Sequence, residues 1–213
     1  MSRPLVILFG TLLFAVFGFH SCLILVREPS HPRAELIEDD YPLETGLTWV
    51  YKSAMGLQVV RRVAPNPFLV PDGPLNERSL SSSLGTLWYE MQYDLPLLGR
   101  KTLLMRRTNK GIEAKWGEVE QLIMKFPMIT GHSWTIDFPT EDLAECTVLE
   151  PEEIDVLGRR VRASKLQIVR TDRKTGKKTT DFEWYVRGIG LARMEVTFGL
   201  KANFILSRFE KAE

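Results

Sequence analysis

The stretch Tyr41–Tyr51 (YPLETGLTWVY) returns in the second half of the chain as Phe126–Ile136 (FPMITGHSWTI). Both copies hold proline, threonine, glycine and tryptophan in the same places. Proline fixes an extended approach, glycine permits a tight turn, and the β-prone residues that follow carry the tryptophan into a strand. We therefore expect the copies to open two related halves of one β domain, with Trp49 and Trp134 both buried and similarly placed.

Beyond the repeated stretch, apolar and polar residues alternate with a period of two, which is typical of strands. The alternation is clearest in residues 87–93, 182–186 and 200–206. Turn residues such as glycine, asparagine and lysine separate these runs. Many short strands joined by tight turns predict a mainly β fold, an antiparallel barrel or half-barrel, over residues 41–213.

Residues 1–26 are expected to anchor the chain in a membrane, with residues 4–26 inside the bilayer. Residues 4–26 include no lysine, arginine, aspartate or glutamate, and as a helix they would span roughly 34 Å. Phe19-His20-Ser21-Cys22 faintly resembles a bacterial lipobox, so a lipoprotein signal with Cys22 lipidated is the alternative. The polar residues 27–40 are interpreted as a juxtamembrane linker between this single transmembrane helix and the β domain.

Charge argues against one class of partner and marks one candidate surface. The 28 basic and 27 acidic side chains nearly cancel, so we expect no nucleic-acid partner. Residues 137–155 are acidic and residues 159–178 are basic. The basic run is interpreted either as a surface for anionic lipid head groups or as a strand that pairs with its acidic neighbour. Its candidate binding residues are Arg159, Arg160, Arg162 and Lys165.

Aromatic residues and a proline-rich segment suggest a second candidate site. Residues 64–83 contain four prolines, which exclude a central strand, and the apolar Phe68 in their middle is a candidate lid over a barrel opening. Trp88, Tyr89 and Trp116 are candidates for lining an apolar cavity, and core packing is the alternative.

No reactive arrangement is evident in the sequence. His20 and His31 lie in the anchor and the linker, while His132 replaces Leu47 within the repeated stretch. Cys146 has no histidine nearby in the sequence, and no spacing typical of a metal site is present. We therefore expect no cofactor, no metal and no catalytic residue. The enzymatic alternative is an envelope hydrolase that uses carboxylates of residues 137–155.

The motifs resemble those of a family of bacterial envelope proteins and lipoproteins of uncharacterised function. They are YPLxxGxxWxY at Tyr41–Tyr51, PxxxGxxW at Pro127–Trp134 and WYxxGxGL at Trp184–Leu191. The resemblance implies an exported β domain, loosely similar to the half-barrel of periplasmic lipoprotein carriers, and no catalytic residue. We therefore expect the chain in the bacterial cell envelope with the C-terminal domain extracytoplasmic. Independently of the resemblance, a lipid or another envelope protein is a candidate partner.

Overall fold

The computed structural model describes residues 41–70, 86–96, 99–138, 142–197 and 201–212, and these form thirteen strands. The predicted anchor, the linker and most of the proline-rich segment lie outside the described residues. Within the described ranges, no helix is long and apolar enough to cross a membrane. The strands are β1 (Leu47–Ser53), β2 (Gln58–Val63), β3 (Phe68–Val70), β4 (Thr86–Leu95), β5 (Gly99–Thr108), β6 (Gly111–Trp116), β7 (Val119–Lys125), β8 (Ser133–Asp137), β9 (Asp142–Val156), β10 (Arg159–Asp172), β11 (Lys178–Val186), β12 (Gly190–Val196) and β13 (Ala202–Lys211).

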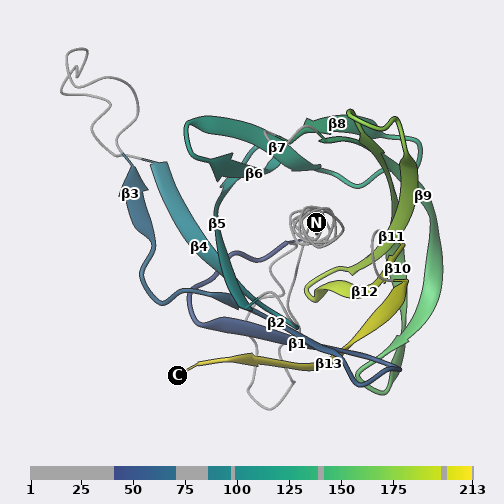
Figure 1. The fold of residues 1–213 in the computed structure, drawn as a ribbon. Coiled ribbons are helices and arrows are strands. Elements are labelled where there is room, and N and C mark those ends of the chain that lie inside the picture. Colours follow the sequence, from purple (N-terminus) through teal and green to yellow (C-terminus); the bar gives the residue numbers. More distant parts are fainter. Residues whose placement is uncertain (1–40, 71–85, 97–98, 139–141, 198–200, 213) are drawn as a thin grey trace, which may run out of the picture.

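The strands form an antiparallel, nearly closed barrel, which confirms the predicted fold class of the β domain (Figure 1). Twelve strands follow one another around a ring in the order β7-β6-β5-β4-β2-β1-β13-β12-β11-β10-β9-β8. The first strand, β1, pairs with the last, β13, from Leu47 opposite Lys211 to Ser53 opposite Phe204. Within the described ranges, the ladder of backbone hydrogen bonds is interrupted only between β7 and β8.

The repeated stretch opens each half of this ring. Gly46 and Gly131 both have positive φ, at 80° and 85°, a conformation that glycine adopts without strain. Each backbone N–H donates to a carbonyl of a neighbouring segment, Gly46 to Val63 and Gly131 to Val148. A strand follows at once in both places, β1 after Gly46 and β8 after Gly131. The predicted turn-then-strand geometry is therefore confirmed in both copies.

The expectation of equally buried tryptophans is wrong for Trp134. Trp49 is fully buried, whereas Trp134 is half-buried against the edge of the core. The difference follows from position in the ring. Trp49 lies on a strand with a hydrogen-bonded neighbour on each side, while β8 has a ladder on one side only.

Side chains close the gap between β7 and β8, which lie together at the top of Figure 1. The Gln121 side chain accepts a hydrogen bond from the backbone N–H of Asp137 at 2.8 Å and donates one to the Asp137 carbonyl. The Trp134 indole N–H donates to the Ile123 carbonyl at 3.1 Å. Because a glutamine amide offers a donor and an acceptor as a peptide group does, it substitutes for a missing ladder rung.

The proline-rich segment extends the wall of the ring. Both β2 and β3 pair with β4, with Val63 opposite Met91 and Phe68 opposite Trp88. Ala64-Pro65-Asn66-Pro67 interrupts what would otherwise be one long strand, because proline has no backbone N–H to donate. The backbone of Phe68 therefore lies beside β4 (Figure 1), and its side chain, the predicted lid, lies outside what the structure describes.

Inward-facing side chains of all parts of the ring join one hydrophobic core. Trp49, Tyr51, Met91 and Met105 are fully buried within it, as are Ala144, Ile168 and Met194 from the second half. Alternation along each strand places these residues on one face and the charged residues between them mostly on the other.

We predict that Gln121→Ala lowers the free energy of unfolding by about 1 kcal/mol, because two hydrogen bonds to Asp137 are lost and water replaces them only in part. Urea unfolding gives the change, and hydrogen exchange should show faster exchange of the Asp137 amide. Gln58→Ala is the control, since Gln58 is exposed on β2. Equal effects of the two substitutions would show that the side-chain seam contributes nothing.

Candidate functional site

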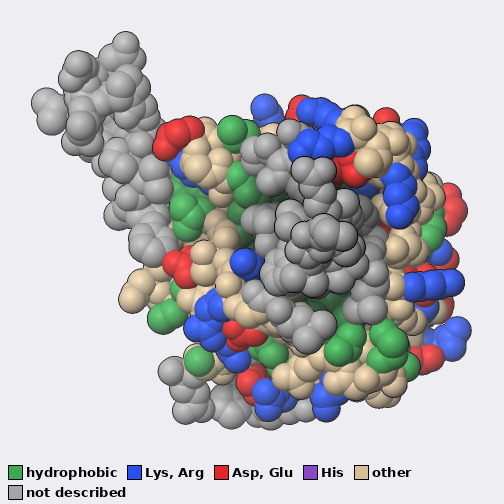
Figure 2. Space-filling model, in the orientation of Figure 1, with side chains coloured by type: hydrophobic (Ala, Val, Ile, Leu, Met, Phe, Trp, Pro, Cys, Tyr) green, Lys and Arg blue, Asp and Glu red, His purple; other side chains and the backbone are tan. Residues whose placement is uncertain are grey.

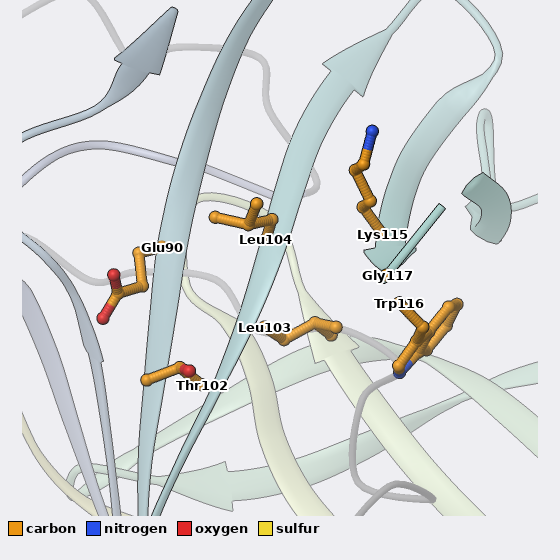
Figure 3. A pocket seen from close by; sticks show the side chains of 7 residues that line it. All are labelled: Glu90, Thr102, Leu103, Leu104, Lys115, Trp116 and Gly117. Carbon is orange, nitrogen blue, oxygen red and sulfur yellow. The ribbon is translucent and has the colours of Figure 1, made fainter. Parts of the chain in front are cut away.

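A pocket of about 590 Å³ opens in the wall of the ring where β6 ends (Figure 3). Strand β6 pairs with β5 only from Gly111 opposite Thr108 to Lys115 opposite Leu104, so among the described strands none pairs with the first half of β5 on that side. The chain turns away at Gly117, whose φ of 59° is one that glycine tolerates. The pocket is lined by Glu90, Thr102, Leu103, Leu104, Lys115, Trp116 and Gly117.

The pocket combines an apolar wall with one charge of each sign. Leu103 is buried and Leu104 and Trp116 are half-buried, and the Trp116 ring meets Phe138 edge-on with ring centroids 5.6 Å apart. Figure 3 shows the leucines on the central strand, with Glu90 on one side and Lys115 on the other. Such a lining suits a ligand that has both an apolar body and a polar head.

A cation–π cluster supports the same part of the wall. The Arg106 guanidinium lies 4.6 Å from the centre of the Trp88 ring and the Lys115 ammonium 5.9 Å from it. Arg106 is held in turn by Glu113 at 2.7 Å and by Glu120 at 3.0 Å. Trp88 is almost completely buried, although it lies on the face of β4 opposite Met91 and the core. Lys115 thereby links Trp88 to the pocket.

The structure brings together two of the four aromatic residues proposed from the sequence. Trp116 lines the pocket, and Trp88 lies under Lys115 at its border. Tyr89 is half-buried against the hydrophobic core instead. Phe68 pairs with Trp88 through its backbone, and only its backbone is described.

The basic candidates lie on the other side of the ring, on the long β9–β10 hairpin. Arg160 stands opposite Asp155 and Arg162 opposite Glu153, so the acidic and basic runs do pair across the ladder. Arg160 contacts Asp155 at 3.8 Å, and Lys165 contacts Glu152 at 2.5 Å. Figure 2 shows basic and acidic side chains interleaved along that edge of the molecule. Arg159 is exposed at the start of β10.

Lys165 takes part in a second aromatic cluster. Its ammonium lies 5.1 Å from the centre of the Trp184 ring, and the Arg193 guanidinium lies 4.5 Å from it. The Trp184 indole donates to Glu152 at 2.8 Å. Hydrogen bonds from Lys165 and Trp184 lower the pKa of the Glu152 carboxyl. Trp184 is thus buried, with charged side chains over its ring and the Phe182 ring centroid 6.2 Å away.

Sequence reasoning missed a set of buried ionisable residues inside the ring. Arg61 is fully buried, 4.8 Å from the centre of the Tyr93 ring and 5.9 Å from that of Tyr51. Glu183 is buried and accepts a hydrogen bond from the Tyr185 hydroxyl. Burial raises the pKa of Glu183 to about 8, against the opposing effects of Tyr185, Arg61 and other neighbours. The carboxyl is therefore mostly protonated at neutral pH.

An ion pair extends this buried set. Arg170 and Asp181 meet at 3.0 Å, both almost fully buried. Asp181 also accepts hydrogen bonds from the backbone and side chain of Thr197, at 2.7 Å and 3.1 Å. The signal in the sequence was the alternation Asp181, Glu183, Tyr185, which occupies the inward face.

The positions of Cys146 and of the acidic residues 137–155 argue against a cysteine nucleophile and against a hydrolase that uses those carboxylates. Cys146 is buried, and burial raises the pKa of its thiol, so little nucleophilic thiolate forms. Among described carboxylates of residues 137–155, Asp142 is buried, whereas others are exposed along β9, namely Glu145, Glu150, Glu153 and Asp155. These side chains therefore do not converge in one pocket. Within the described ranges, no group of three or more histidine, cysteine or acidic residues is placed to hold a metal ion.

Comparison with known proteins identifies distant structural likenesses. No protein-family model matches the chain, and no curated protein is similar to it. A "putative exported protein with YmcC-like fold" from Bacteroides fragilis NCTC 9343 shares 16% identity with a TM-score of 0.44. A "putative lipoprotein" from Parabacteroides distasonis ATCC 8503 shares 13% identity with a TM-score of 0.42. Each match covers 80% of this chain and 98% of the solved chain. At these TM-scores neither match indicates a function for this chain.

We predict that stability falls as pH rises from 4.5 to about 8, by up to roughly 1.4 kcal/mol per pH unit from Glu183. The sign follows from the raised pKa. In that window the folded state keeps the Glu183 proton and the unfolded state has lost it, so rising pH favours unfolding. Denaturant unfolding across the window measures the slope.

Glu183→Gln should remove this contribution and flatten the pH profile, because an amide does not titrate. Glu150→Gln, on the exposed side of β9, should leave the profile unchanged. Identical slopes for the original chain and Glu183→Gln would show that Glu183 is ionised in the folded protein.

Proposed function

We propose that this chain is a membrane-anchored, extracytoplasmic β-barrel domain of the bacterial cell envelope with a non-catalytic binding role. Its ligand would be an amphipathic molecule of the lipid class, held in the wall pocket between β4, β5 and β6. The observation that supports the proposal is the composition of the pocket, in which Leu103, Leu104 and Trp116 form an apolar wall next to Glu90 and Lys115.

The apolar wall would supply most of the binding free energy. A hydrocarbon chain packed on Leu104 and Trp116 would leave water, at about 25 cal/mol for each Å² buried. The pocket volume of about 590 Å³ suits one small ligand or one segment of an acyl chain. Leu103 belongs to the core and gives the wall a fixed position.

Lys115 would provide selectivity for an anionic head group. Its ammonium forms a salt bridge with the Glu120 carboxylate at 3.0 Å, and Arg106 contacts the same carboxylate. A ligand phosphate or carboxylate would compete with Glu120 for Lys115. Glu90, across the pocket, would disfavour an anion on that side and so orient the ligand.

We place the ligand in the wall rather than in the centre of the barrel. The inward-facing side chains form one continuous buried cluster, and among its polar groups Arg170 pairs with Asp181 and Glu183 accepts a hydrogen bond from Tyr185. A partner protein of the envelope that docks an apolar side chain in the pocket is the alternative occupant.

The cellular location rests on the sequence. Residues 4–26 are long enough and apolar enough to cross a bilayer, and residues 27–40 would connect that anchor to Tyr41. The resemblance of the motifs at Tyr41–Tyr51 and Trp184–Leu191 to those of bacterial envelope proteins supports export of the β domain. Lipidation at Cys22 would be a second way to hold the same domain at a membrane.

Leu104→Glu should weaken binding of a fluorescent anionic fatty acid by about tenfold or more, because an apolar contact is replaced by a charge of the same sign as the probe. Lys115→Gln should weaken the same probe but not its neutral alcohol analogue. Fluorescence titration gives both dissociation constants. Ile205→Glu, exposed on β13, is the matched control for the leucine. Unchanged affinity in both pocket variants would refute this site.

Export is tested with reporter fusions to the C-terminus. Alkaline phosphatase, which needs an oxidising compartment, should be active, and β-galactosidase should be inactive on the same chain. Removal of residues 4–26 should reverse the pattern. Active β-galactosidase on the full chain would place the β domain in the cytoplasm and contradict the proposal.

A further inference from the structure

The tip of the β9–β10 hairpin lies at the same end of the ring as the start of β1. Adjacent strands are antiparallel, so β1, β10 and β12 all start at one end. Strand β10 starts directly after the tip, and β1 starts where residues 1–40 join the described domain. The β1–β2 turn, which carries the exposed Met55, lies at the opposite end.

The tip holds an exposed apolar residue in an unfavourable backbone conformation. Leu157 and Gly158 form a two-residue turn between Val156 and Arg159, with φ values of 49° and 74°. Asparagine or glycine is preferred at the position of Leu157, because a branched side chain is strained at positive φ. Leu157 is nevertheless 38% exposed. Contact of the side chain with an apolar phase would offset both the strain and the exposure.

Arginines follow this leucine on β10, and the exposed acidic residues Asp155 and Glu153 face them on β9. Arg159, Arg160 and Arg162 are all exposed. Arg160 makes a long contact of 3.8 Å with Asp155, and among the described residues neither Arg159 nor Arg162 makes a salt bridge. Pairing between β10 and β11 begins only at Ser164 opposite Tyr185, so the hairpin projects beyond its neighbour.

We propose that this tip, residues 155–162, docks on an anionic phospholipid surface. Leu157 would enter the interface between head groups and acyl chains, while the arginine guanidinium groups bind lipid phosphates. The leucine would lie at the depth of the acyl chains, and the arginines would lie above it at the depth of the phosphates.

The reach of the N-terminal segment favours a membrane over a soluble partner. This step rests on the anchor that is part of the proposed function. Residues 27–40 can extend to at most roughly 50 Å, and they join the domain at the end that carries the tip. An anchor in residues 4–26 would therefore hold Leu157 within reach of the same bilayer.

Photo-crosslinking of the full chain in vesicles tests the proposal. The substitution Leu157→p-benzoylphenylalanine places the probe at the tip, and Met55→p-benzoylphenylalanine places it at the opposite end as the control. Vesicles of phosphatidylcholine with or without phosphatidylglycerol are irradiated after reconstitution, and lipid adducts are measured by intact mass. We expect at least fivefold more phosphatidylglycerol adduct from position 157 than from position 55.

Charge reversal separates the arginines from the leucine. Arg159→Glu in the probe-bearing chain should reduce the adduct at least threefold, whereas Lys52→Glu, an exposed position near Met55, should leave it unchanged. An unchanged urea midpoint shows that each variant is folded. Equal adduct yields at positions 157 and 55, or adducts to protein instead of lipid at position 157, would overturn the proposal.

Flotation of the same vesicles separates the two proposals. Protein that floats with the vesicles but gives no lipid adduct at position 157 refutes the tip contact and leaves the anchor standing. Protein that stays in the aqueous fraction refutes the anchor and the tip contact together.

Discussion

The antiparallel pairing of β1 with β13 is the interaction on which the rest of the structure depends. It joins the first and last strands of the domain, so that neither is left with an unpaired edge. Trp49 and Phe204, from the two partners, both belong to the core. Such a distant pairing has a greater loop-closure entropy cost than a local hairpin, so we expect the ring to close after its local hairpins form.

The candidate functional features lie where a strand loses a neighbour. The wall pocket occupies the space beside β5 that β6 leaves open, and the hairpin tip extends past the end of β11. The barrel interior, in contrast, contains the paired charges of Arg170 and Asp181. A complete ladder gives stability, and each interruption exposes side chains that a ligand or a surface can contact.

The sequence was sufficient for the fold class and for the local turns. Period-two alternation predicted strands, and Gly46 and Gly131 do adopt the predicted turn. Alternation shows which residues share a face but not which face is inward. Asp181, Glu183 and Tyr185 alternate with Phe182, Trp184 and Val186, and this alternation alone does not show that Glu183 lies on the inner face with Arg61 and Tyr185. The pocket depends on where β6 ends relative to β5. The half-buried state of Trp134 depends on the missing ladder between β7 and β8 in the described sheet. Both are consequences of long-range register, which no local pattern encodes.

The seam between β7 and β8 has a consequence for the order of the chain itself. Gly46 and Ala212 are already adjacent, with the Ala212 N–H donating to the Gly46 carbonyl at 2.9 Å. A circular permutant that joins these two points and opens the chain between Lys125 and Ser133 would keep every backbone ladder of the ring. In connectivity the domain is thus two meanders of six ring strands in tandem, and which one comes first is not dictated by the barrel.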